Sequence, residues 1–88
     1  MKVLHENTPK MLFVCRGSIK DGVGHITRTR TVADSAVKSG EVRVAVLGDS
    51  FLDALLRDSK FEHKYLNSDI QVLDEITSFK PDILVLDM

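Results

Sequence analysis

The sequence predicts an α/β protein with a Rossmann-like three-layer sandwich, in which a parallel sheet of about four strands has the order 3-2-1-4. Short apolar runs typical of buried strands alternate with segments of helical periodicity, and residues that favour turns separate them. Right-handed crossovers between parallel strands place helices on both faces of such a sheet. With 88 residues, the chain is long enough for one small domain.

Seven elements are expected, and each depends on a local pattern. Their order is strand 11–15, helix 24–39, strand 42–47, short helix 51–57, strand 61–66, helix 70–79 and strand 82–87. The first strand is a continuous apolar run, which is typical of strands buried on both faces. The first long helix begins at Gly24 or His25, has apolar residues at helical spacing, and ends before Gly40, which is a usual stop residue.

Similar patterns predict the remaining elements. β-Branched residues favour the second strand, and Asp49 or Ser50 can cap the short helix after it. The third strand alternates weakly and carries charges, which suits the edge of a sheet. A turn and cap at 67–69 precede the second long helix, which ends at residues 80–81. The final strand is apolar up to Asp87, as is typical of a central parallel strand.

Composition excludes several classes of function. Twelve basic and thirteen acidic side chains leave a net charge of -1, which gives no overall attraction to nucleic acid or to an anionic membrane. No apolar run approaches membrane-spanning length, and residues 1–9 are interpreted as a short leader or an edge segment. A single cysteine excludes an intrachain disulfide, so a cytoplasmic location is expected. The three histidines show no metal-ligand spacing, and neither a metal nor a cofactor is expected.

The loop between the first strand and the first long helix carries the candidate site. Gly22 and Gly24 let the backbone approach a ligand closely, and the start of a helix attracts anions. In the predicted strand order the topological switch point lies between the first and fourth strands, so Arg16, this loop and Asp87 are expected to converge there. The third glycine of a dinucleotide-binding fingerprint is missing, which argues against NAD binding.

The spacing Gly22-x-Gly24-His25-x-x-Arg28 resembles the amino-terminal domain of GT-B-fold enzymes that use nucleotide sugars. It is most similar to the UDP-sugar hydrolase of pseudaminic acid synthesis and its spore-coat polysaccharide relatives, and more distantly to the N-acetylglucosaminyltransferase of peptidoglycan synthesis. Arg16 also matches the hydrolase pattern, although the loop here is shorter and lacks the acidic residue that follows that arginine. The resemblance implies a histidine base in a cleft between two domains, with the nucleotide held mainly by a carboxy-terminal domain. Residues 10–88 would then be the amino-terminal half, without that second domain.

The residues themselves also suggest roles. A histidine in the first turn of a helix lies at the positive end of the helix dipole, which favours the neutral imidazole that a general base needs. Arg28, one turn later, is placed to hold a phosphate, and Thr29 adds a hydroxyl. The alternative for His25 is a packing or hydrogen-bonding role at the helix start. Cys15, at the end of a buried strand, is expected to be a core residue and not a nucleophile.

The leading hypothesis is therefore the amino-terminal part of a nucleotide-sugar-dependent glycosyltransferase or a related UDP-sugar hydrolase. His25 is the expected general base, and the substrates are a UDP-sugar and a sugar or glycan acceptor. The expected substrate-binding or phosphate-binding residues are Arg16, Gly22, Gly24, Arg28 and Asp87. The isolated chain is expected to be inactive, because half a cleft does not enclose a nucleotide sugar.

Two alternatives remain open. The first is a non-catalytic product, either a truncated fragment or a binding subunit that needs a separate donor-binding chain. The second is remote: residues 80–88 resemble the strand of receiver domains that ends at the phospho-acceptor aspartate, here Asp87, but residues 15–17 lack the acidic pair of such domains. In either case the uncovered side of the last strand is expected to favour association with a second domain, a partner chain or another copy of this chain.

Overall fold

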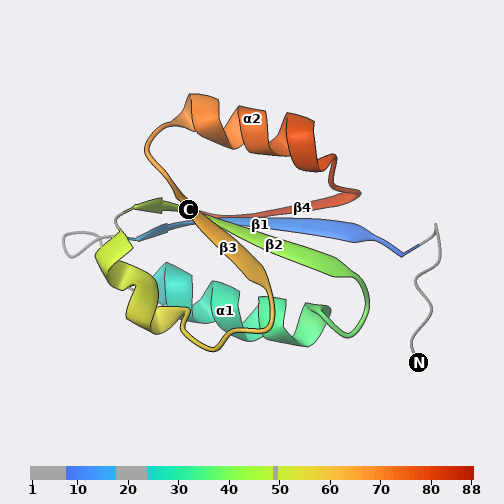
Figure 1. The fold of residues 1–88 in the computed structure, drawn as a ribbon, viewed down its shortest axis with the longest axis horizontal. Coiled ribbons are helices and arrows are strands. Elements are labelled where there is room, and N and C mark those ends of the chain that lie inside the picture. Colours follow the sequence, from blue (N-terminus) through green and yellow to red (C-terminus); the bar gives the residue numbers. More distant parts are fainter. Residues whose placement is uncertain (1–7, 18–23, 49) are drawn as a thin grey trace.

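The computed structural model describes residues 8–17, 24–48 and 50–88, and it confirms the predicted α/β fold. One parallel four-stranded sheet has the order β3-β2-β1-β4, with α1 on one face and α2 on the other (Figure 1). The elements are β1 (Lys10–Gly17), α1 (Gly24–Ala36), β2 (Glu41–Gly48), the 3-10 helix η1 (Ser50–Leu55), β3 (Glu62–Leu66), α2 (Asp69–Phe79) and β4 (Ile83–Asp87). The leader or edge segment predicted at 1–9 lies mostly outside the described residues.

Element boundaries differ by one residue from the predicted ones in β2, β3, α2 and β4, and by more in three other elements. β1 has eight residues and extends beyond 11–15 at both ends, because all eight are paired in parallel with β2. The predicted helix end at Ser39 is wrong: α1 ends at Ala36, and Ser39 N donates to Ala36 O in a tight turn at 2.8 Å. The element predicted as a helix at 51–57 is the shorter 3-10 helix η1. None of these differences changes the order of the strands.

The sheet separates two hydrophobic clusters, because successive side chains of each strand point to opposite faces. The cluster on the α1 side contains Met11, Phe13, Cys15, Ile26, Ala33, Val42, Val44, Val46, Leu56 and Phe61. The cluster on the α2 side contains Leu12, Val14, Ala45, Leu66 and Phe79. β1 therefore contributes to both cores, as expected for a strand that is covered on both faces.

Burial makes Cys15 a core residue, as predicted. Its side chain is fully buried, and burial raises the pKa of the thiol to about 11. At pH 8 the thiolate is then about a hundredfold rarer than for a thiol at the ordinary value of 9.0, so we expect iodoacetamide to leave Cys15 unmodified in the native protein and to label it in denaturant. Mass spectrometry measures the difference. Rapid labelling of the native protein would contradict this assignment.

A network of ion pairs holds α2 against the sheet. Glu75 of α2 is buried, and its carboxylate accepts from Arg43 Nη1 at 2.8 Å and from Lys64 Nζ at 3.0 Å. Arg43 also binds Glu62 at 3.0 Å, and its guanidinium lies 4.5 Å from the centre of the Phe79 ring. Burial by itself raises the pKa of Glu75, but the bonds from Lys64 and Arg43 outweigh it and the pKa is lowered. Glu75 therefore remains charged, and its cations come from two different strands.

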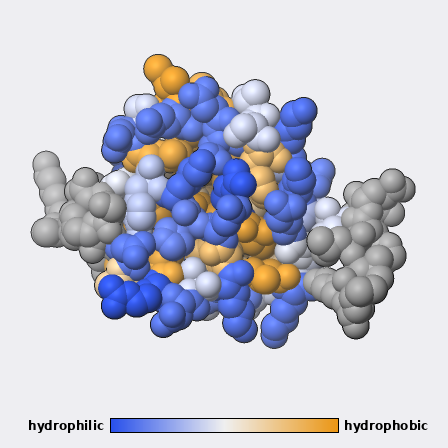
Figure 2. Space-filling view, in the orientation of Figure 1, coloured by the Kyte–Doolittle hydropathy of each residue, from blue (hydrophilic) through white to orange (hydrophobic). Residues whose placement is uncertain are grey.

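The β4 strand is an edge of the described sheet, although its apolar sequence predicted a central position. The four aliphatic side chains before Asp87 are between 36% and 58% exposed; they are Ile83, Leu84, Val85 and Leu86. They belong to both faces of the sheet, since alternate residues point to opposite sides. Ile70 and Leu73 of α2 are exposed as well, and Figure 2 shows hydrophobic surface over this helix. Within the described ranges, no helix combines the length and the apolar character needed to cross a membrane.

Candidate functional site

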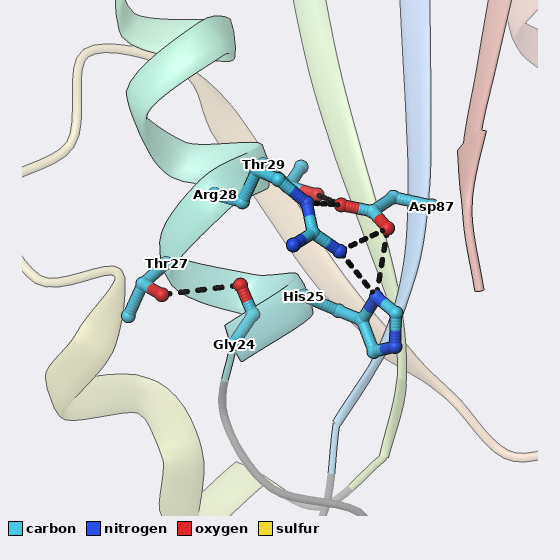
Figure 3. Close-up of polar contacts among 6 residues, drawn as sticks. All are labelled: Gly24, His25, Thr27, Arg28, Thr29 and Asp87. Carbon is cyan, nitrogen blue, oxygen red and sulfur yellow. Dashed lines mark hydrogen bonds and ion pairs between the residues drawn. The ribbon is translucent and has the colours of Figure 1, made fainter.

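Two side chains of α1 and one from the end of β4 meet at the carboxyl edge of the sheet (Figure 3). Asp87, the last residue of β4, pairs with Cys15 of β1, so its side chain lies on the face that α1 covers. His25 and Arg28 come from the first turns of α1 and point toward it. Although 62 residues separate His25 from Asp87, the parallel pairing of β1 with β4 brings the end of β4 beside the start of α1.

Arg28 binds Asp87 through two hydrogen bonds. Its Nε donates to Oδ2 at 2.8 Å and its Nη2 donates to Oδ1 at 2.7 Å, which is the bidentate geometry of a strong charge-assisted pair. Thr29 Oγ1 lies 3.5 Å from Oδ2. The bonds from Arg28, followed by the bond from His25, hold the pKa of Asp87 well below its usual range, and Asp87 in turn raises the pKa of Arg28. Asp87 is therefore a carboxylate at neutral pH.

Two contacts of the His25 ring bear on which tautomer it adopts. Its Nδ1 lies 2.7 Å from Asp87 Oδ1 and 2.9 Å from Arg28 Nη2. Arg28 Nη2 can only donate and favours a lone pair on Nδ1, whereas the carboxylate of Asp87, which is nearer, repels a lone pair and favours a proton there. We therefore assign the proton to Nδ1, which donates to Asp87, so that Nε2 carries the lone pair in the neutral ring. Figure 3 shows the second ring nitrogen on the side away from Asp87, and the side chain is 35% exposed.

This arrangement is suited to general base catalysis. A carboxylate bound to one imidazole nitrogen fixes the orientation of the ring and stabilises the imidazolium that forms when the other nitrogen takes a proton. Arg28 balances the charge of Asp87, so the carboxylate is held in place without leaving a net charge on the pair. Among the described residues Arg28 uses Nε and Nη2 on Asp87, which leaves its Nη1 donors to contact an anion.

The other predicted site residues are Arg16, Gly22 and Gly24. Arg16 was expected to converge with Asp87, but alternation along β1 places it on the opposite face from Cys15, where it lines a cavity. Gly22 lies outside the described residues. Gly24 is the first residue of α1, and a Cβ there would meet nothing within 4 Å, so close packing does not require a glycine at this position. Within residues 8–17, 24–48 and 50–88, no group of three His, Cys, Asp or Glu side chains could hold a metal ion.

A second histidine–aspartate pair was not predicted from the sequence. His63 Nε2 and Tyr65 Oη both donate to Asp53 Oδ1 at 2.9 Å, which ties η1 to β3. Burial, followed by the bond to Asp53, raises the pKa of Tyr65, whereas the bonds from His63 and then Tyr65 lower the pKa of Asp53. His63 and Tyr65 are two residues apart on one strand, so their side chains lie on the same face of the sheet. This spacing could have predicted the cluster. His63 is therefore a natural control for His25, because each histidine is bonded to an aspartate.

Comparison with known proteins adds no relative. No protein-family model matches this sequence, and neither curated proteins nor solved structures give a significant match to it. The fold and the site together define a class by geometry: an α/β protein of Rossmann-like architecture, with a carboxylate-oriented histidine at the carboxyl edge of its parallel sheet. Open α/β sheets bind their ligands at that edge.

The ion pair between α1 and β4 is expected to persist into mild acid. The pKa of Asp87 is lower in the folded protein than the value of about 3.9 for an unfolded chain. The ionised carboxylate therefore stabilises the fold fully at pH values above about 3.9, and this stabilisation is lost as the pH falls toward the pKa of the folded protein. Carbon NMR of the Asp87 carboxyl group should therefore give a midpoint below about 3.9. Arg28→Gln should move the midpoint up, and a midpoint at or above the ordinary value in the unaltered protein would contradict the bidentate pair.

Proposed function

We propose that the chain is the amino-terminal part of a nucleotide-sugar-dependent glycosyltransferase or a related UDP-sugar hydrolase, with His25 as its general base. The observation that supports this most directly is the 2.7 Å hydrogen bond between His25 Nδ1 and Asp87, which makes Nε2 the basic nitrogen at the ligand-binding edge of the sheet. The resemblance of Gly22-x-Gly24-His25-x-x-Arg28 to GT-B enzymes supports the substrate class.

In the proposed reaction Nε2 of His25 takes a proton from the attacking group, which is an acceptor hydroxyl in transfer or water in hydrolysis. The deprotonated oxygen forms a bond to the anomeric carbon, the bond from that carbon to the diphosphate breaks, and UDP leaves with the electron pair. Asp87 stabilises the imidazolium while it carries the proton. The Nη1 donors of Arg28 are available to an oxygen of the diphosphate.

A second domain or a partner chain would complete the cleft. One edge of a sheet supplies a single wall, whereas sites for ligands of this size enclose most of the ligand surface. The exposed aliphatic residues of β4 supply a surface that such an association, or pairing with another copy of this chain, would cover. The same exposure favours the second candidate function, a binding subunit that works with a separate donor-binding chain. Turnover by the purified 88-residue chain alone would contradict that second candidate.

The test of the proposed function is release of UDP from UDP-N-acetylhexosamines. The protein should be isolated together with any chain that accompanies it in the cell, and wild type should be compared with His25→Ala. A wild-type assembly that releases no UDP would contradict the substrate class. Turnover that is unchanged by His25→Ala would contradict the role of the histidine. A cytoplasmic location is part of the proposal, and the single, buried, unpaired cysteine supports it.

A further inference from the structure

A cavity lies on the other face of the sheet, at the carboxyl ends of β1, β2 and β3. Its volume is about 520 Å³. Four polar residues line it: Arg16 from β1, Asn67 and Ser68 from the turn between β3 and α2, and Asp69 from the start of α2. Figure 1 shows the chain passing along this edge of the sheet from β3 into α2. The cavity is separate from the His25 site, because Arg16 and Asp87 lie on opposite faces of the sheet.

Backbone and aliphatic side chains form the rest of the cavity wall. Leu47 and Leu66, paired in the register of β2 and β3, supply its apolar part. Gly48 is paired with Gly17, and a Cβ at Gly48 would lie 2.1 Å from Gly17 O. Only glycine therefore lets the ends of β1 and β2 come this close at the cavity. The wall there is bare backbone, next to two leucines.

The charges in the cavity favour a neutral ligand. Arg16 and Asp69 contribute one positive and one negative charge, so an anion attracted by Arg16 would be repelled by Asp69. The start of α2 also has fewer open N–H groups than a bare helix end. Ser68 Oγ accepts from Gln71 N at 3.4 Å, and Gln71 Oε1 accepts from Asn67 N, so two backbone amides at this turn already have partners. A phosphate would therefore meet fewer open amides here than at an uncapped helix start.

We propose that this cavity binds a neutral polyhydroxyl ligand, the chemical class of sugars and sugar alcohols. The guanidinium of Arg16 donates to hydroxyl oxygens, the carboxylate of Asp69 accepts from hydroxyl groups, and the Asn67 amide does both. The two leucines pack against the C–H groups of such a ligand. The volume lies within the range of about 300–1,000 Å³ found for small-molecule sites. This inference does not depend on the role proposed for His25.

The test is an NMR titration of the ¹⁵N-labelled chain with N-acetylglucosamine and, separately, with inorganic phosphate. We expect saturable shifts with the sugar at the amides of Gly48, Leu66 and Asn67, and no saturable shifts there with phosphate. Asn67→Ala and Asp69→Ala should each weaken binding of the sugar at least about tenfold, because each removes direct hydrogen bonds. The matched control is Asp74→Ala, on the exposed surface of α2, which should bind as the wild type does.

The outcomes separate the proposal from its alternatives. Saturable binding of phosphate in preference to the sugar would overturn it in favour of an anion site. Absence of saturable shifts with N-acetylglucosamine, glucose and glycerol alike would overturn it as well. Both substituted residues are exposed, so the amide spectrum of each variant should show an intact fold and assign any loss of binding to the cavity. His25→Ala should leave binding of the sugar in the cavity unchanged. Failure of the cavity proposal is therefore distinguishable from failure of the function proposed for His25.

Discussion

Replacing His25 by alanine is expected to lower kcat for release of UDP by about 10²–10⁴-fold in the active assembly, the usual contribution of a general base. The substitution removes Nε2 and leaves the Arg28–Asp87 pair in place. KM should change little, because the proton is transferred in the transition state and not when the substrate binds. Steady-state kinetics of UDP release, measured over a range of sugar-nucleotide concentrations, separate the two effects.

His63→Ala is the matched control for this experiment. His63 is also bonded to an aspartate, at 2.9 Å from Asp53, but it lies on β3 and outside the site. Its loss should leave kcat nearly unchanged. Asp87→Asn should lower kcat as well, because the side-chain amide no longer holds the proton on Nδ1. Equal losses in His25→Ala and His63→Ala would mean that the effect comes from the fold, and the assignment of the base would fail.

Replacing Arg43 by methionine is expected to lower the free energy of unfolding by about 3 kcal/mol, the cost of breaking a buried ion pair from one side. Glu75 is only 4% exposed, and the change removes the bond from Arg43 Nη1 at 2.8 Å. Lys64 is then its one remaining cation among the described residues. The guanidinium over the Phe79 ring is lost too. Urea denaturation followed by circular dichroism measures the change.

Two further variants test the reason for that loss. Arg43→Met combined with Glu75→Leu removes the buried carboxylate as well as its partner, so it should recover most of the lost stability. Arg57→Met replaces an arginine that is exposed, and it should change the free energy of unfolding by less than about 0.5 kcal/mol. A double variant no more stable than Arg43→Met would show that the loss has another origin, such as packing of the arginine stem.

Hydrophobic patterning was enough to predict the layers and the strand order. Apolar runs mark the strands, alternation with helices requires parallel crossovers, and the structure confirms the order 3-2-1-4. The ends of helices were less predictable. Gly40 marks a position where a helix cannot easily continue, but α1 already ends at Ala36, because local turn hydrogen bonds such as that from Ser39 N replace the helical ones. A stop residue such as Gly40 therefore marks the last position that a helix can reach, and the helix can end several residues before it.

For the site, too, the sequence predicted which segments of the chain meet but not how the individual side chains are placed. The rule that ligand-binding residues gather at the switch point suggested that His25 and Asp87 lie near each other, and the structure places them in hydrogen-bond contact. The shared use of Asp87 by Arg28 and His25 depends on side-chain positions that no sequence spacing specifies. Arg16 was misplaced because the predicted strand ended at Cys15. Once β1 is seen to continue to Gly17, alternation sends Arg16 to the other face.

The hydrogen bond between His25 and Asp87 forms late during synthesis of the chain, because Asp87 follows His25 by 62 residues. When synthesis has reached the end of β3, α1 and its histidine are already present, but no carboxylate holds the ring. Parallel pairing over a long stretch of sequence is slow to form, and the partner of His25 is 62 residues away. The carboxylate that orients the ring is therefore in place only when β4 has paired with β1. Before this last pairing the chain contains His25 without the carboxylate that orients its ring.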